Sequence, residues 1–154
     1  MRSYSTVFEV LAPGSRVWRI MSDVERWPEW TPTMSSVRRW SGSGLEVGAS
    51  FEVKQPGLRP TIMSVTEFHE NESFTWTSTA RGVVSTARHR VIPAEGPHGS
   101  ATRVELNFEV DGPMAPLVWV LYGRKIRRFV DVEAARLKEV SEEPYWFLAG
   151  LRSL

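Results

Sequence analysis

The sequence contains three histidines, and one of them, His89, lies in a segment where residues on one face are small or apolar. The alternation over residues 83–92 is typical of a half-buried strand and places His89 on the inward face. The other residues expected on that face are Ser85, Ala87 and Val91. Because an imidazole has an ordinary pKa near 6.5, His89 could serve as a hydrogen-bonding group in a pocket or as a general acid and base. Two alternatives stay open: a hydrogen-bonded core histidine, or a slipped register that leaves His89 outside.

Tyr122 is the second side chain with potential chemistry, since it lies on the predicted inner stripe of a long C-terminal helix. A buried tyrosine hydroxyl normally requires a hydrogen-bond partner. Tyr122 could therefore orient a ligand carbonyl or hydroxyl, or make a purely structural bond. His89 and Tyr122 are the candidate catalytic residues, but they complete no known catalytic motif. His69 and His98 fall in predicted turns and are interpreted as solvated.

Composition and motifs argue against several classes of protein. The 154 residues include no cysteine, which removes disulfides and thiolate chemistry. The histidines are widely spaced, and no HExxH, GxSxG, Walker or dinucleotide motif occurs, so we predict no metal site and no cofactor. A formal net charge of +1 argues against nucleic acid as a partner. No segment approaches the ~20 apolar residues of a membrane span and no signal peptide is recognised, so we expect a cytoplasmic protein.

The elements that must position these side chains follow from periodicity and turn residues. Residues 6–10 alternate as a strand, and two short helices are predicted over residues 15–22 and 23–27, the second ended by Pro28. The further strands are predicted at residues 35–40, 50–54, 61–68, 73–79, 83–92 and 102–110. A helix over residues 113–143 follows, with an apolar stripe from Val118 to Val140. Short turns imply an antiparallel meander, and packing the helix into its concave face buries both apolar surfaces at once.

Several short motifs occur at defined places in this order of elements. They are Ala12-Pro13 with Val17-Trp18, the run DVERWPEWTP at residues 23–32, VTEF at residues 65–68, and Phe74-Thr75-Trp76. With them, residues 4–143 resemble the START-like (Bet v 1-like, SRPBCC) superfamily, and within it the polyketide cyclase/dehydrase-like branch. The resemblance implies an α+β helix-grip fold, a curved antiparallel sheet of six to seven strands wrapped around the long C-terminal helix. Two short helices follow the first strand, and one domain spans residues 1–154.

The resemblance also implies a cavity between sheet and helix, which would bind a small hydrophobic or amphipathic ligand such as a polyketide, isoprenoid or lipid. The residues expected to line it are Trp27, Trp30, Phe51, Met63, Val65, Phe74, Trp76, His89, Leu106, Phe108, Tyr122 and Ile126. The alternative is an aromatase/cyclase-type enzyme. A second alternative is a protein-interaction module that uses the apolar C-terminal tail (residues 146–154). Three coverings of this tail stay open: the domain itself, the second subunit of a homodimer, or a hydrophobic partner. The basic run at residues 124–128 is interpreted as a solvated helix face, or else as a contact for an anionic membrane or acidic partner.

Overall fold

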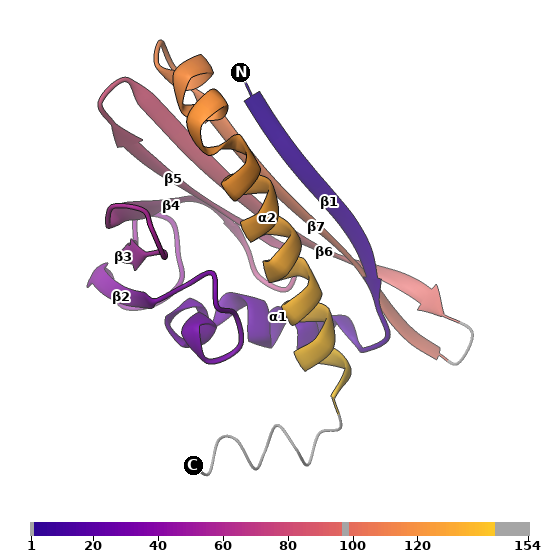
Figure 1. Cartoon of the computed structure of the whole chain (residues 1–154). Coiled ribbons are helices and arrows are strands. Elements are labelled where there is room, and N and C mark those ends of the chain that lie inside the picture. The colour runs from indigo at the N-terminus through magenta and orange to yellow at the C-terminus, as the bar shows by residue number, and fades with distance from the viewer. Residues whose placement is uncertain (1, 97–98, 144–154) are drawn as a thin grey trace.

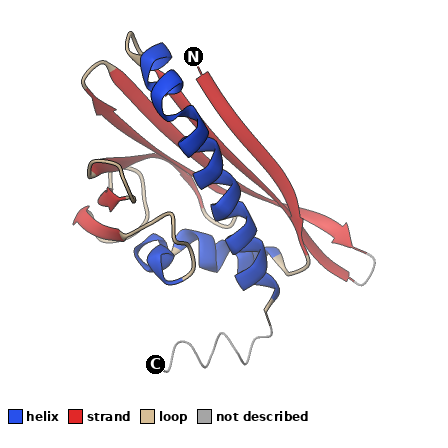
Figure 2. Ribbon diagram, in the orientation of Figure 1, coloured by secondary structure: helices blue, strands red, loops and turns tan. Residues whose placement is uncertain are grey.

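The computed structural model describes residues 2–96 and 99–143, so the tail on which the interaction hypothesis depends lies outside the described residues. The chain forms a seven-stranded antiparallel sheet whose strand order is β1-β7-β6-β5-β4-β3-β2, and a long helix, α2, lies across one face of it (Figures 1 and 2). The elements are β1 (Arg2–Val10), α1 (Gly14–Ser22), the 3-10 helix η1 (Val24–Glu29), β2 (Ser36–Ser41), β3 (Ser50–Lys54), β4 (Thr61–His69), β5 (Ser73–Ala80), β6 (Val83–Gly96), β7 (Gly99–Asp111) and α2 (Ala115–Glu142). The predicted helix-grip α+β fold is confirmed.

The long strands pair as their alternation predicts. Phe8 of β1 lies opposite Val104 of β7, and both side chains face the core, whereas Glu9 is exposed. Farther into the sheet, His89 of β6 lies opposite Leu106 of β7, and both are buried. The inward register of His89 is therefore confirmed.

Pro93 does not end β6 at residue 92, as the sequence suggested. The strand continues to Gly96, and Pro93 lies opposite Thr102 of β7. The pairing of β5 with β6 stops at Arg90, so β6 has only one strand partner beyond this point. Proline lacks a backbone N–H and is tolerated where one side of a strand is unpaired.

The inner face of α2 differs from the predicted stripe in its first half. Val130, Ala134, Leu137 and Val140 are buried as expected. Tyr122, however, is 42% exposed, so the expected burial of its hydroxyl is wrong. The buried residue here is Gly123, and one residue along a helix is a rotation of about 100°, which moves Tyr122 to the edge of the inner face.

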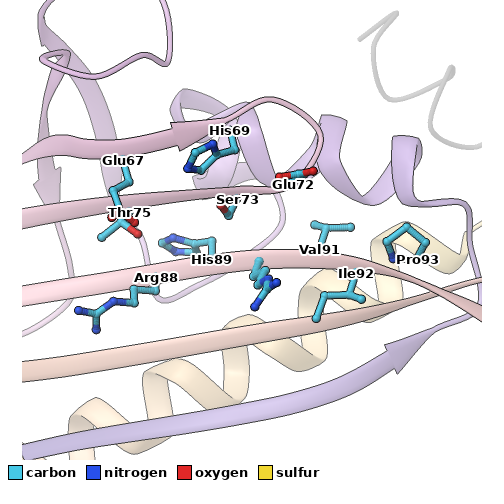
Figure 3. Close-up of a pocket in the computed structure, with 11 residues that line it drawn as sticks. Glu67, His69, Glu72, Ser73, Thr75, Arg88, His89, Val91, Ile92 and Pro93 are labelled. Atoms are coloured by element: carbon cyan, nitrogen blue, oxygen red, sulfur yellow. The ribbon is translucent and has the colours of Figure 1, made fainter.

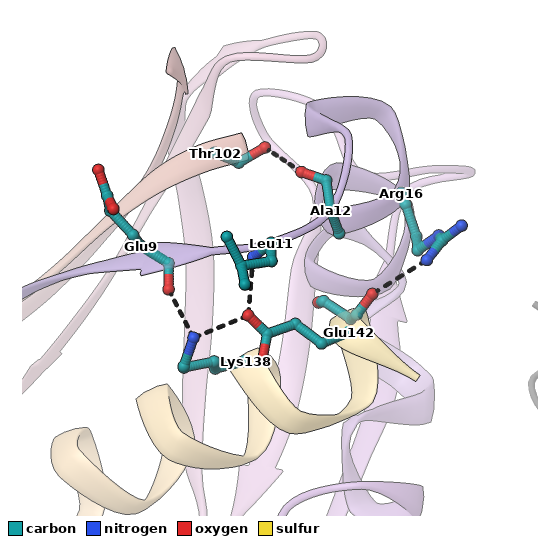
Figure 4. Close-up of polar contacts among 8 residues, drawn as sticks. Glu9, Leu11, Ala12, Arg16, Thr102, Lys138 and Glu142 are labelled. Atoms are coloured by element: carbon teal, nitrogen blue, oxygen red, sulfur yellow. Dashed lines mark hydrogen bonds and ion pairs between the residues drawn. The ribbon is translucent and has the colours of Figure 1, made fainter. Parts of the chain in front are cut away.

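Polar contacts fasten the C-terminal end of α2 to the segment that joins β1 and α1 (Figure 4). Glu142 accepts hydrogen bonds from the Leu11 backbone N–H and from Lys138 Nζ, both at 2.7 Å. Arg16 of α1 donates to the Ser141 carbonyl oxygen at 3.3 Å. Glu142 is thus part of the anchor of the helix.

A second contact holds the middle of α2 against β1. The Tyr4 hydroxyl donates a hydrogen bond to Asp131 Oδ1 at 2.7 Å. The helix is therefore fixed at two places, to β1 and to the segment that follows β1, and its inner face is held against the sheet.

Candidate functional site

Trp27 lies at the centre of an aromatic cluster on the face of the sheet that α2 covers. The 3-10 helix η1 carries it, and its indole Nε1 donates a hydrogen bond to the Met21 carbonyl oxygen at 3.0 Å. Its ring centroid lies 5.3 Å from that of Trp76, 5.4 Å from that of His89 and 5.9 Å from that of Trp30. Because both its ring and its N–H are satisfied by protein contacts, Trp27 forms a fixed wall.

His89 and Glu133 form a buried polar pair between the sheet and the helix. His89 Nε2 lies 3.7 Å from Glu133 Oε1, and the two side chains are only 5% and 13% exposed. The imidazole stacks on the Phe74 ring, with centroids 4.2 Å apart, and its Nδ1 lies 3.4 Å from the Phe74 carbonyl oxygen. That oxygen can only accept a hydrogen bond, so Nδ1 carries the proton in neutral His89 and the Nε2 lone pair is directed to Glu133.

Burial favours the neutral form of both partners. It lowers the pKa of His89 to about 4, against the opposing effect of the Phe74 carbonyl oxygen, and it raises the pKa of Glu133 to about 8. Near neutral pH the pair therefore consists of a neutral imidazole that can accept a proton and a carboxylic acid that can donate one. Opposite pKa shifts in adjacent groups are a feature of acid–base sites.

A cavity of about 100 Å³ lies against this pair. Its wall combines side chains of η1, the sheet, the turn between β3 and β4, and α2, and most of it is apolar. The lining residues are Trp27, Met34, Val53, Gln55, Leu58, Thr61, Met63, Trp76, Ala87, His89, Phe108, Ile126, Phe129, Val130 and Glu133. The cavity is thus an apolar space with its acid and its base on one side.

Comparison with known proteins agrees with this architecture. Residues 1–142 match the family described as polyketide cyclase / dehydrase and lipid transport. The chain belongs to this family. The match covers the seven strands and the whole of α2, so the resemblance found in the sequence is confirmed. No curated protein matches the chain.

Solved structures with the same fold come from several bacteria. A protein from Nitrosospira multiformis is 17% identical with a TM-score of 0.69, and the match covers 91% of this chain and 96% of that one. XoxI from Bacillus cereus is 16% identical with a TM-score of 0.65, covering 92% and 96%. A START superfamily protein from Mycobacterium smegmatis is 22% identical with a TM-score of 0.62, covering 90% and 98%. At these identities the likeness shows the fold alone.

In this member of the family, half of the predicted ligand-binding residues line the cavity. They are Trp27, Met63, Trp76, His89, Phe108 and Ile126. Phe51, Val65, Phe74 and Leu106 are buried in the packing around it, and Trp30 is buried against Trp27. Tyr122 does not line it. Contact of any of these residues with a ligand stays a prediction.

Sequence analysis missed Glu133, although a signal for it exists. Glu133 follows Val130 by three residues and precedes Leu137 by four, so it occupies the inner stripe of the helix. A carboxylate on a buried stripe is costly and is a reason to suspect a specific partner. Phe129 was predicted as core but not as cavity wall.

A wider hollow, of about 490 Å³, lies on the opposite face of the sheet (Figure 3). Since His89 faces α2, its neighbours Arg88 and Arg90 lie on the other face of the sheet, where Arg88 Nη1 donates hydrogen bonds to Asn107 Oδ1 and Glu109 Oε1 of β7. Acidic, basic, neutral polar and apolar side chains all line this hollow. Among the residues that the structure describes, no three His, Cys, Asp or Glu side chains could hold a metal ion together. None of the described helices is long and apolar enough to cross a membrane.

Proposed function

We propose that the chain binds a small, largely apolar molecule that carries one hydroxyl or carbonyl group in the cavity between the sheet and α2. The observation that carries this proposal is the neutral pair of His89 and Glu133 at the side of an otherwise apolar space. Buried polar groups need hydrogen-bond partners, and 3.7 Å is long for a bond between the two side chains. A ligand hydroxyl can donate to His89 Nε2 and accept from Glu133, which satisfies both.

The volume of the cavity restricts the part of a ligand that it can hold. An apolar cavity of about 150 Å³ in another protein accommodates benzene, so about 100 Å³ suits one small ring or a short chain. A complete polyketide, isoprenoid or acyl chain is larger than this. Such a ligand would place only one end beside His89 and extend outward between α2 and the turn that carries Gln55 and Leu58.

Calorimetric titration with phenol and with toluene tests the proposal, because the two molecules differ in shape by little more than the hydroxyl. We expect phenol to bind roughly tenfold more tightly, since each hydrogen bond contributes about 1 kcal/mol. His89→Phe keeps a stacked ring but should remove this preference. Ala87→Leu should fill the cavity and abolish binding of both molecules. Binding of neither molecule to a folded wild-type chain refutes the proposal.

A second function, acid–base catalysis, is favoured by the same pair. In a dehydration, His89 Nε2 would take a proton from the carbon next to a carbonyl, and Glu133 would give its proton to the departing hydroxyl, which leaves as water. A proton passed from His89 to Glu133 restores both groups, so no cofactor is needed. The family description names cyclases and dehydrases, and this step belongs to their chemistry.

The enzyme hypothesis is tested by product analysis with a reactive poly-β-ketone mimic. We expect His89→Ala and Glu133→Gln to change the product distribution while phenol still binds to Glu133→Gln. The matched control is Glu139→Gln, because Glu139 lies on the same helix but is exposed and pairs with Arg136. If wild type and both site variants give the same products as the reaction without protein, the chain is a carrier and not a catalyst.

A further inference from the structure

A third hollow, a groove of about 390 Å³, lies beside the cavity along α2. Its floor is apolar and is formed by Pro32, Pro56, Phe129 and Val132. Phe129 also lines the cavity, so the groove and the cavity share this side chain as a wall. A molecule that entered the cavity past Phe129 would therefore have its outer end in the groove.

Three cations border this groove: Arg124, Lys125 and Arg128. Farther along α2, the basic side chains have acidic partners: Arg136 pairs with Glu139, and Lys138 pairs with Glu142. These three form no ion pair and no side-chain hydrogen bond with any described residue. Lys125 Nζ lies 5.8 Å from the centroid of the Phe129 ring and directly over Gly57, which places its charge at the boundary between groove and cavity.

Unpaired like charges around an apolar floor repel one another, and an anion placed among them would relieve that repulsion. We propose that the groove binds the carboxylate of an amphipathic ligand, whose apolar end lies in the cavity. This inference rests on the proposed binding function and adds the charge and the orientation of the ligand. The basic run at residues 124–128 would then bind the charged end of the ligand, whereas the sequence was interpreted as a solvated helix face.

The run itself supplies a matched control. Arg127 stands in its middle, but its guanidinium carbon lies 5.4 Å from the centroid of the Trp119 ring and it does not line the groove. Arg103 is exposed on β7 and also lies outside the groove. The variants Lys125→Gln/Arg128→Gln and Arg103→Gln/Arg127→Gln each remove two positive charges, so they alter the net charge of the chain equally.

The experiment compares octanoate with 1-octanol by calorimetric titration at low salt, because the two differ in their head group and hardly in chain length. We expect octanoate to bind roughly tenfold more tightly to the wild-type chain, since each exposed ion pair changes affinity by up to about fivefold and two cations, Lys125 and Arg128, lie beside the carboxylate. The groove variant should lose this preference and keep its affinity for octanol. The control variant should retain the preference, and added salt should weaken it in both chains that show it.

The outcomes separate this inference from the function on which it rests. Equal binding of octanoate and octanol, or equal loss of the preference in both double variants, overturns the inference and leaves the proposed function intact. Failure of phenol, octanol and octanoate to bind overturns both. Vesicles of phosphatidylglycerol test the other source of anions. If they bind through Lys125 and Arg128 while octanoate shows no preference over octanol, the groove contacts a lipid surface and the inference is wrong.

Discussion

Replacing Glu133 by glutamine should stabilise the folded chain at neutral pH. The side chain is almost fully enclosed, and burial raises its pKa to about 8 from an ordinary value of 4.5. Between these two pH values the folded state keeps the proton that the unfolded state has lost. The stability of the wild-type chain therefore falls as pH rises from 4.5 to 8. Glutamine has nearly the same shape and no proton to lose, so it removes this dependence.

The size of the effect follows from proton linkage. Each pH unit inside this window costs the wild-type folded state 1.36 kcal/mol relative to the unfolded state. From pH 5 to pH 7 the advantage of Glu133→Gln over the wild type should consequently grow by about 3 kcal/mol. A difference between two pH values is the useful quantity, because any change in packing caused by the substitution cancels from it.

Urea unfolding of the wild type, Glu133→Gln and the surface control Glu139→Gln at both pH values measures this quantity. The control should show no such pH-dependent gain, since Glu139 is exposed and paired with Arg136. If the difference between Glu133→Gln and the wild type is the same at pH 5 and pH 7, Glu133 is ionised in the folded chain. The arrangement of a neutral carboxylic acid beside a neutral imidazole would then be refuted.

Three further predictions concern single side chains. Burial holds the pKa of His89 near 4, so wild-type stability is lost as pH falls from 6.5 toward 4. In urea unfolding, His89→Phe should therefore lose about 2 kcal/mol less than the wild type between pH 6.5 and 4.5, and parallel curves would contradict this. Gly112 has a φ of 103°, and a Cβ at this position would overlap the Gly82 carbonyl oxygen. Gly112→Ala should therefore reduce the free energy of unfolding by more than about 1 kcal/mol and lower the thermal midpoint by several degrees. An unchanged midpoint would show that the turn can relax. Burial alone would raise the pKa of Glu142, but the hydrogen bonds that it accepts from the Leu11 N–H and Lys138 outweigh burial and lower the pKa. In the same unfolding assay, Glu142→Gln should reduce the free energy of unfolding by about 1 kcal/mol at pH 7, and this loss should shrink as pH falls below 4.5. A loss that does not change with pH would mean that the charge of Glu142 does not contribute to stability.

The fold could be predicted because each long element has one strong period. Alternation in β7 and in β1 determines which side chains face the core, and short turns leave an antiparallel order as the simple solution. The same alternation placed His89 inward, and its position opposite Leu106 confirms the register. The extension of β6 through Pro93 was missed, because the sequence does not reveal that β5 stops pairing at Arg90.

The site was less predictable, because a cavity is the space that packing leaves unfilled. Periodicity states that Phe74, Phe51 and Trp76 all face inward, but only Trp76 borders the void. The predicted burial of Tyr122 was wrong for a related reason. The inner stripe was defined by large apolar residues, whereas Gly123 is the residue that α2 buries at this level. Glu133 was not predicted, because the stripe was defined by apolar residues alone.

Glu133 lowers the stability of the folded chain, and its position beside the cavity offers a functional reason for this. An ionisable group that lowers stability by about 3 kcal/mol at neutral pH is typical of functional sites, where activity often requires a destabilised arrangement. The carboxyl of Glu133 is carried by α2, which Tyr4 and Glu142 hold against β1 and the segment after β1. His89 is carried by β6, a central strand between β5 and β7. The 3.7 Å between the two groups is thus held by rigid elements on both sides. This distance is too long for a good hydrogen bond between His89 and Glu133, and the surrounding elements keep it fixed. A ligand oxygen placed between the two side chains would supply the hydrogen bonds that both groups lack.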